Sequence, residues 1–363
     1  MPDKQTIRRS ATAGQLHTAA GKGAIAEAAT VLRAGGTVAF PTETVYGLGA
    51  NALDAASVAK IFVAKQRPSW DPLIVHISDV RMLARVVAEV PRAAQRLMDA
   101  FWPGPLTLLL PRSTAVPPIV TAGRDLVGVR MPAHPVALAL IGACHLPIAA
   151  PSANRFGHTS PTTAAHVLDD LDGRIDMVLD GGPTEHGVES TVLEVREGEV
   201  VVYRPGAITL EEVQAVAGNA VLCPAQPLQP TQAAQQPASL PSPGVGIRHY
   251  APQARMVLVE TAGLGDAERE RAWLRAVQGA QQAQGGGLLC GVLLPEQWPL
   301  PQGFSGVQFD WGDWSDPAKL AQRLFAGLRT LDAMGATVIV CPVPTGIGIG
   351  AAIRDRILKA AHE

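Results

Sequence analysis

The stretch from residue 37 to residue 77 constrains the fold most strongly, because short apolar runs alternate there with polar loops. Residues 37–40 are mainly apolar and end at Pro41, which has no N–H for a sheet ladder, so they predict a short strand. Asp54 is a residue type that caps helix N-termini and Pro68 stops a helix, so a helix is expected between them. A second apolar run closes the stretch, and the pattern is typical of an α/β fold.

The polar residues of this stretch fall in its two loops. Thr44 lies in the first loop, where Gly47 and Gly49 are expected to let the backbone turn close to a neighbouring group. Lys65 and Arg67 lie at the end of the expected helix and the start of the second loop. Complementarity to the helix dipole is the simpler interpretation of this pair, and a role in binding is the alternative.

Strand and helix patterns alternate through residues 1–220, and some neighbouring strands lack a helix between them. One such pair, residues 190–195 and 200–203, is expected to form a hairpin. We therefore predict a first domain of α/β class, with an open, twisted, mixed sheet and helices packed on it. Residues 1–20 are polar and rich in alanine, and we expect them to form a loose arm.

The composition changes after residue 220. Residues 224–243 are rich in Pro, Gln and Ala and too poor in apolar groups to build a core, so we assign residues 221–252 to a linker. The linker ends in the sequence SPGVGIRHYAP, which is polar, aromatic and rich in turn formers. A spacer does not need an Arg-His-Tyr cluster, so a function is predicted for this end of the linker.

Residues 253–363 alternate strand and helix patterns at the spacing of a parallel sheet, which predicts a smaller, doubly wound, Rossmann-like α/β domain. Gly346, Gly348 and Gly350 stand between its last strand and its last helix. Their G-x-G-x-G spacing differs from the dinucleotide fingerprint, so a tight turn is the simpler interpretation and ligand binding is the alternative.

Composition argues against several classes of function. Of the 363 residues, 47% are hydrophobic, which excludes wholesale disorder, and 4% are aromatic, too few for a base-stacking platform on single-stranded nucleic acid. The net charge of −2 demands no basic face, so stable binding of DNA is not expected. Because no signal peptide, membrane span or paired cysteine motif is visible, we expect a soluble, cytoplasmic protein with reduced thiols.

Common catalytic motifs are missing from the chain, including the P-loop, H-E-x-x-H and G-x-S-x-G. The loops instead carry hydroxyl, amide and guanidinium groups, which suit an anionic ligand and a reaction such as nucleotidyl transfer. Taken singly, Ser152 and Asn154 could be turn formers and Arg204 a surface charge. The complete set is Thr44, Lys65, Arg67, Arg130, Ser152, Asn154, Ser160, Ser190, Arg204 and Tyr250.

Eight short motifs follow one another along the first domain. In order they are residues 41–49 (PTETVYGLG), 65–67 (KQR), 72–76 (PLIVH), 102–105 (WPGP), 129–132 (VRMP), 150–154 (APSAN), 189–192 (ESTV) and 204–206 (RPG). This order resembles the YrdC-type threonylcarbamoyl-AMP synthase family, and the linker motif and second domain resemble the longer, two-domain branch of that family. The resemblance covers nearly the whole chain from about residue 21.

The resemblance implies a nucleotidyltransferase, an L-threonylcarbamoyladenylate synthase. Such an enzyme converts L-threonine, bicarbonate and ATP into L-threonylcarbamoyladenylate and pyrophosphate, the first step of tRNA threonylcarbamoyladenosine modification. A downstream tRNA threonylcarbamoyl-transferase complex would use the product. Mg²⁺ would arrive with the ATP phosphates, and no side chain is assigned to it as a ligand.

The resemblance also implies roles for individual residues. Those expected to bind L-threonine are Thr44, His76, Arg130, Ala150 and Ser190. Those expected to bind ATP are Arg67, Asp71, Leu126, Ser152, Ser160, Arg204 and Tyr250. Those expected to be catalytic are Lys65, Arg67, Ser152 and Asn154. Leu126 would act through its backbone, and Tyr250 would reach from the linker over the nucleotide.

The residue types agree with this chemistry. The threonine amine can take up carbon dioxide to form a carbamate, whose oxygen then attacks the α-phosphate of ATP. Lys65, Arg67 and Mg²⁺ would neutralise the departing pyrophosphate, and Arg130 could bind the threonine carboxylate through a bidentate fork. The linker is expected to act as a lid that shields the adenylate from water.

The sequence departs from the family pattern in two places. Asp71 stands where the family usually has Asn, which places an anion near the triphosphate. Val245 and Gly246 stand where the linker usually carries Met and a basic residue.

Two alternatives remain open at this point. The first is a module that binds double-stranded RNA or tRNA in the same positive cavity. The second is a carbamoyl-transfer enzyme, since the same fold occurs in hydrogenase-maturation proteins, although this chain lacks their zinc-finger and acylphosphatase parts.

Overall fold

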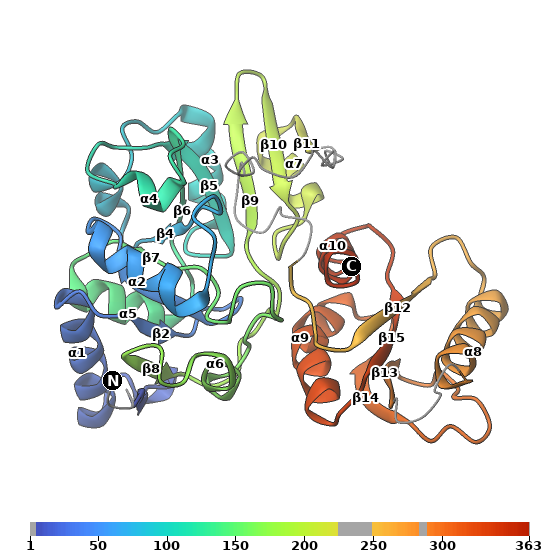
Figure 1. The fold of residues 1–363 in the computed structure, drawn as a ribbon. Helices are drawn as coiled ribbons and strands as arrows, with labels where there is room; N and C mark the ends of the chain where they lie inside the picture. Colours follow the sequence, from blue (N-terminus) through green and yellow to red (C-terminus); the bar gives the residue numbers. More distant parts are fainter. Residues whose placement is uncertain (1–4, 224–248, 283–288, 363) are drawn as a thin grey trace, which may run out of the picture. The chain divides into compact units, whose positions relative to one another are not determined.

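The structure, a computed structural model, describes residues 5–223, 249–282 and 289–362 (Figure 1). The chain divides into two compact units. The first consists of Met1–Phe156, Ser160–Glu185 and Glu189–Gly246, and the second of Gly157–Thr159, His186–Val188 and Ile247–Glu363. Most of the predicted linker, including its Ser-Pro-Gly sequence and the Val245 and Gly246 departures, lies outside the described residues.

One large sheet forms the centre of the first unit. Its strands are β1 (Ile7–Ser10), β2 (Val38–Phe40), β3 (Gly47–Asn51), β4 (Ile74–His76), β5 (Leu106–Pro111), β6 (Leu126–Arg130), β7 (Ile148–Ala149), β8 (Met177–Asp180), β9 (Thr191–Arg196), β10 (Glu199–Arg204) and β11 (Ala220–Leu222). Their order across the sheet is β1-β8-β2-β3-β7-β4-β6-β5-β9-β10-β11. Because β4 pairs parallel with β6 while β3 pairs antiparallel with β2, the sheet is mixed and the predicted fold class is confirmed.

Helices cover both faces of this sheet, and the alternation of side chains along β2 shows how. Val38 and Phe40 pack into a cluster with two helices on one face, whereas Ala39 packs into a larger cluster on the other. The helices are α1 (Ala19–Arg33), α2 (Ala55–Lys65), α3 (Arg92–Phe101), α4 (Pro118–Thr121), α5 (Pro135–Cys144), α6 (Ala164–Leu171) and α7 (Leu210–Ala217), with 3-10 turns η1 (Ala13–Gln15) and η2 (Val80–Arg85). The smaller cluster contains α1 and α5.

The predicted helix after Asp54 is confirmed as α2. The Asp54 carboxylate accepts hydrogen bonds from the N–H groups of Ala56 at 3.1 Å and Ser57 at 3.2 Å, which caps the helix. The helix ends at Gln66, which adopts a left-handed conformation with φ of 55°. This end places Lys65 in the last helical turn.

Two parts of the first unit differ from the prediction. The loose arm expected in residues 1–20 is wrong, because Ile7–Ser10 form β1, which pairs parallel with β8 at the edge of the sheet. All four of its residues are exposed, so this edge strand carries no apolar pattern. The turn expected at Gly47 and Gly49 is also wrong, because both glycines lie in β3. A Cβ at Gly49 would lie 2.7 Å from Ile148 Cγ2, so close packing requires glycine there.

The second unit contains a four-stranded parallel sheet. Its strands are β12 (Arg255–Glu260), β13 (Cys290–Pro295), β14 (Val307–Gly312) and β15 (Val338–Val343), and its helices are α8 (Asp266–Gln282), α9 (Pro317–Ala333) and α10 (Gly350–Ala360). The strand order is β12-β15-β13-β14, with parallel pairing throughout. Figure 1 shows α8 on one face of this sheet and α9 and α10 on the other, which confirms the doubly wound prediction. Gly348 lies in a turn directly before α10 and has a φ of 57°, whereas Gly350 is the first residue of the helix.

Candidate active site

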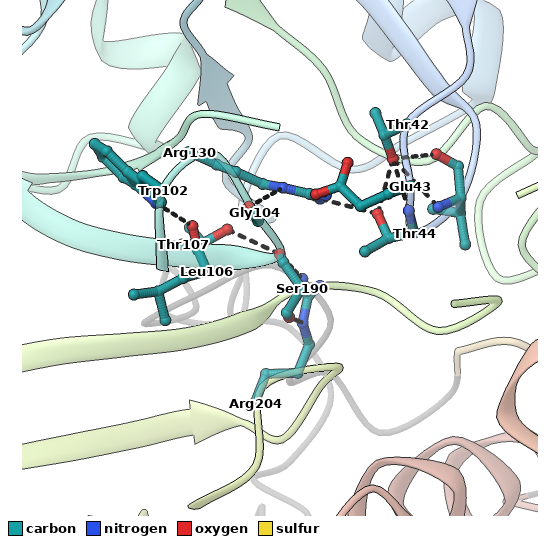
Figure 2. Close-up of polar contacts among 11 residues, drawn as sticks. Thr42, Glu43, Thr44, Trp102, Gly104, Leu106, Thr107, Arg130, Ser190 and Arg204 are labelled. Atoms are coloured by element: carbon teal, nitrogen blue, oxygen red, sulfur yellow. Dashed lines mark hydrogen bonds and ion pairs between the residues drawn. The ribbon is translucent and has the colours of Figure 1, made fainter. Parts of the chain in front are cut away.

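Arg130 is the centre of a buried polar cluster at the end of β6 (Figure 2). Its Nη1 donates to Thr44 Oγ1 at 2.9 Å, and its Nε donates to the carbonyl of Gly104 at 3.2 Å. Its Nη2 lies 2.5 Å from Glu43 Oε1. Thr44 is held in turn by Thr42, whose hydroxyl oxygen lies 2.8 Å away. The guanidinium is therefore held in one orientation by two parts of the chain, the loop of residues 42–44 and Gly104.

Glu43 was not predicted as a site residue, although it stands in the polar loop after the first strand. Burial raises the pKa of its carboxyl, but the charge and hydrogen bond of Arg130 outweigh burial and hold that pKa below its ordinary value. Glu43 is therefore a carboxylate at neutral pH. The only signal for it in the sequence was a charged residue between two apolar runs.

His76 lies beside Arg130, because the two residues are register partners in the parallel pair of β4 and β6. Burial, followed by the neighbouring Arg130 charge, lowers the pKa of the His76 imidazole to about 3. The ring also makes an edge contact with Phe40, with centroids 6.2 Å apart. His76 is therefore a neutral imidazole beside a fixed guanidinium.

A second group of hydroxyls and a guanidinium surrounds Ser190. Its hydroxyl oxygen lies 2.8 Å from Thr107 Oγ1 and accepts a hydrogen bond from Arg204 Nη2 at 3.0 Å. The hairpin of β9 and β10 brings Arg204 to Ser190, and the pairing of β5 with β9 brings Thr107 there. The N–H of Thr191 also donates to the carbonyl of Pro105, next to the Gly104 carbonyl that accepts from Arg130. Sequence reasoning missed Thr107, which lies inside an apolar strand without a motif.

Lys65 is buried and holds the loop that contains Ser152 and Asn154. Its ammonium donates to the carbonyl of Ser152 at 2.7 Å and to the carbonyl of Asn154. Burial, with a further contribution from Arg67, places the pKa of Lys65 well below its ordinary value. In this structure the Lys65 ammonium therefore fixes the loop rather than pointing into solvent.

Arg67 and Asp71 form a buried ion pair, with 2.9 Å between Nη2 and Oδ2. Arg67 Nη2 also donates to the carbonyl of Pro72 at 2.8 Å. Burial raises the pKa of Asp71, and the cations Arg67, Lys65 and Arg204 all oppose this rise. Only Arg67 contacts Asp71 directly, and the charges of Lys65 and Arg204 act on the same carboxyl group without a contact.

The remaining predicted residues lie at different distances from this centre. Ala150 is tied into the sheet by its N–H, which donates to the carbonyl of Ile74 at 2.8 Å. The Ser160 hydroxyl donates to Glu189 Oε1 at 2.6 Å, and Glu189 directly precedes Ser190 in the chain. Leu126 begins β6, whereas Arg130 ends it, so the two lie roughly 13 Å apart along the strand.

Tyr250 packs inside the second unit. Its ring stacks on Phe325 with centroids 5.6 Å apart, and the Arg356 guanidinium lies 5.0 Å from the ring centre. The predicted role of Tyr250, and the lid with it, stays a prediction.

Two negative findings apply to the part of the chain that the structure describes. It contains no group of three or more His, Cys, Asp and Glu residues placed to hold a metal ion. None of its helices combines the length and apolar character needed to cross a bilayer.

Two family profiles match the chain, and they meet near residue 207, before the boundary between the two structural units at residue 246. A profile of the Sua5, YciO and YrdC family, described as "Telomere recombination", matches residues 30–206. A second profile, described as "Threonylcarbamoyl-AMP synthase, C-terminal domain", matches residues 208–362. Together the two profiles cover nearly the whole chain.

Individual relatives match over almost their full length. The chain is 42% identical to a threonylcarbamoyl-AMP synthase of Pyrococcus abyssi, over 92% of this chain and 93% of that protein. It is 44% identical to the threonylcarbamoyl-AMP synthase of Bacillus subtilis, over 93% of this chain and 92% of that protein. Its fold matches the crystal structure of P. abyssi Sua5 complexed with L-threonine with a TM-score of 0.86 and 39% identity, over 98% of each chain.

Proposed function

This chain belongs to the threonylcarbamoyl-AMP synthase family, and from this premise we propose that its first unit converts L-threonine, bicarbonate and ATP into L-threonylcarbamoyladenylate and pyrophosphate. In this reaction bicarbonate takes up a proton and loses water, which gives carbon dioxide. The amine of threonine then adds carbon dioxide and loses a proton, which gives a carbamate. A carbamate oxygen then forms a bond to the α-phosphorus, and the bond between that phosphorus and the bridging oxygen of pyrophosphate breaks. The enzyme is therefore a nucleotidyltransferase.

L-Threonine would bind at the Arg130 cluster. The guanidinium uses three of its N–H groups on Glu43, Thr44 and Gly104, so it is oriented before a substrate carboxylate arrives. Ser190 and Thr44 offer hydroxyls for the substrate hydroxyl, which requires a polar partner when buried. The neutral His76 adds a polar ring without a second positive charge.

The nucleotide would bind beside the Arg67–Asp71 pair, whose carboxyl group also feels the charges of Lys65 and Arg204. Arg67 and Arg204 would face the phosphates, and the Ser152–Asn154 loop and Ser160 would add hydroxyl and amide groups. Lys65 would act by fixing that loop, because its ammonium donates to two of the loop carbonyls. The attacking group belongs to the substrate, so catalysis consists of positioning and charge neutralisation.

The chain provides no protein cage for Mg²⁺ among its described residues. No cluster of three ligating side chains is present there, and the Asp71 carboxylate is engaged by Arg67. Mg²⁺ at nucleotide sites usually keeps several waters and is bound by phosphates and one or two carboxylates, and we propose that phosphates and water would hold it here. Mg²⁺ would supply further charge neutralisation, and no step here depends on a metal ligand from the protein.

The observation that supports this proposal is a pair of buried polar groups in a chain of this family, Arg130 with Thr44 and Arg204 with Ser190. The two groups are linked through the neighbouring carbonyls of Gly104 and Pro105. The test is pyrophosphate release from ATP, measured with and without L-threonine and bicarbonate. Release should require both. A protein that shifted tRNA in electrophoresis but released no threonine-dependent pyrophosphate would refute the proposal in favour of an RNA-binding module.

A matched pair of variants tests the site. Lys65→Ala should lower threonine-dependent pyrophosphate release by about 100-fold, because it frees the loop that positions the nucleotide. Lys60→Ala is the control, since Lys60 lies on the same helix but is exposed and donates to the carbonyl of Gly35. Equal activity of the two variants would contradict the assigned role of Lys65.

We also propose the cellular setting from the same family membership. The adenylate is a reactive anhydride, so a downstream tRNA threonylcarbamoyl-transferase complex is its expected consumer. The expected compartment is the cytoplasm.

A further inference from the structure

The second unit contains a cavity of about 380 Å³ that the reaction above does not use. Its wall is built from the residues that directly follow β13 and β14, and from the first turns of α8, which follows β12. Those strands are parallel neighbours or near neighbours in one sheet, so the cavity lies at the carboxyl edge of that sheet. In open α/β sheets, ligands bind at this edge. The lining residues are Asp266, Arg269, Glu270, Glu296, Gln297, Trp298, Pro299, Asp313, Trp314 and Ser315.

Two tryptophan rings form the aromatic part of this wall. The centroids of Trp298 and Trp314 lie 4.9 Å apart, and both residues are half-buried. Each is supported from behind by a fully buried tryptophan: Trp273 lies 5.5 Å from Trp298, and Trp311 lies 6.0 Å from Trp314. The indole N–H groups of Trp273 and Trp311 donate to the carbonyls of Pro299 and Leu320, so the supporting rings are anchored. The two half-buried rings therefore stand in a fixed arrangement.

The charges around the cavity are mainly negative. The cavity is lined by one guanidinium, that of Arg269, and by four carboxylates, those of Asp266, Glu270, Glu296 and Asp313. Arg269 pairs with Asp266 at 2.7 Å, and none of the other three carboxylates forms an ion pair with any residue that the structure describes. The Arg269 guanidinium lies 5.3 Å from the centre of the Trp298 ring. One cation thus already rests on the aromatic wall, and negative charge remains in excess.

We propose that this cavity binds a small organic cation with an alkylammonium or guanidinium head. The aromatic wall attracts such a head through the negative faces of the rings, and the unpaired carboxylates add charge complementarity. The same carboxylates disfavour a nucleotide or free phosphate, which distinguishes this cavity from the phosphate sites of other doubly wound domains. The site would lie in a domain for which the reaction in the first unit assigns no chemistry.

The test uses the full-length protein and a pair of probes that differ in charge but little in shape, methylguanidinium and methylurea. Calorimetry and intrinsic tryptophan fluorescence, at constant ionic strength, should show saturable binding of methylguanidinium and none of methylurea. Tetramethylammonium should compete with methylguanidinium, whereas Mg²⁺ at equal ionic strength should not.

Variants locate the binding. The double change Glu270→Gln and Glu296→Gln should weaken methylguanidinium binding by about tenfold, since it removes two exposed carboxylates without altering the core. Glu268→Gln is the control, because Glu268 is exposed on the same helix but does not line the cavity. Trp314→Leu should weaken binding about threefold or more, by removing an aromatic face.

Three results would overturn the proposal. Methylurea could bind as well as methylguanidinium, the double variant could bind as tightly as the unaltered protein, or Mg²⁺ could displace the probe. Pyrophosphate release by the first unit serves as an independent measurement, so failure here leaves the proposed reaction untouched.

Discussion

At the scale of single residues, the first unit buries charges that proteins seldom bury. Arg130 is 3% exposed and Glu43 is 2% exposed, and each is the main electrostatic partner of the other. Pairing lowers the free energy of each charge in the interior. Loss of one partner leaves the other charge buried without an opposite charge beside it. Arg67 and Asp71 repeat the arrangement nearby. The orientation of the two guanidinium groups therefore depends on their buried ion pairs with Glu43 and Asp71.

Glu43→Gln tests this dependence. The variant should lower the free energy of unfolding by about 2–4 kcal/mol, because the Arg130 guanidinium loses its charged partner while it stays buried. Urea denaturation measures the change. Glu27→Gln is the control, since Glu27 pairs with Arg9 at the surface and should contribute less than about 1 kcal/mol. A loss for Glu43→Gln no larger than for the control would show that the Arg130 pair stabilises little.

His76 makes stability depend on pH. Its pKa is lowered from 6.5 to about 3, so below pH 6.5 the unfolded chain binds a proton that the folded chain does not. Stability should therefore fall as pH decreases from 6.5 towards 3, by up to about 1.4 kcal/mol per pH unit from this residue. Denaturation midpoints at pH 7.5, 6 and 5 measure the slope.

His76→Asn should flatten that slope, whereas His17→Asn, at an exposed position, should leave it unchanged. An unchanged slope in the His76 variant would mean that other groups dominate the acid sensitivity. The carboxylate of Glu43, whose pKa is also lowered, should add its own loss only at lower pH, below about 4.3.

At the scale of elements, close packing of strands decides the shape of the site. β3 carries Gly49 where a Cβ would lie 2.8 Å from Phe40 and 2.7 Å from Ile148. The absence of a side chain lets β2, β3 and β7 lie together, and these strands lead into the loops that hold Thr44 and Ser152. Glycine is typical of turns, but at position 49 it is required for close packing of the strands.

Gly49→Ala should destabilise the protein by about 1–3 kcal/mol, because the added methyl group overpacks the interior. Gly23→Ala is a matched change with the opposite expected sign, since nothing lies within 4 Å of its Cβ position in α1. That variant should gain about 0.5–1 kcal/mol from helix propensity. Thermal denaturation compares the two, and a neutral Gly49→Ala would contradict the packing argument.

At the scale of the whole molecule, the described residues of each unit contain a hydrophobic cluster built from that unit's own residues. The core clusters on both faces of the large sheet contain first-unit residues, and the cluster around Trp273 and Val340 contains second-unit residues. A ligand that binds one unit stabilises that unit by mass action. The substrates and the cation proposed here should therefore act on different unfolding transitions.

Calorimetry of the full chain should show two transitions. L-Threonine with ATP should raise the transition temperature of the first unit. The free energy of unfolding of that unit should increase by about 2.7 kcal/mol at a ligand concentration of 100 times Kd. Val340→Ala, which opens a cavity in the second core, should lower the other transition. A single transition that both changes move together would contradict the independence of the cores.

The sequence by itself determined the α/β class and the second parallel domain, because hydrophobic period is a local property. Loop chemistry, which is also local, named candidate site residues, and their roles stay predictions. Only the tertiary structure decided which partners those residues have. Thr107 lies in an apolar strand and β1 carries no apolar pattern, yet strand pairing brings one to Ser190 and the other to β8. Lys65 fixes a loop because that loop returns to it after more than eighty residues. Contacts of this kind depend on which distant segments of the chain fold against each other and become buried. No local sequence pattern contains that information.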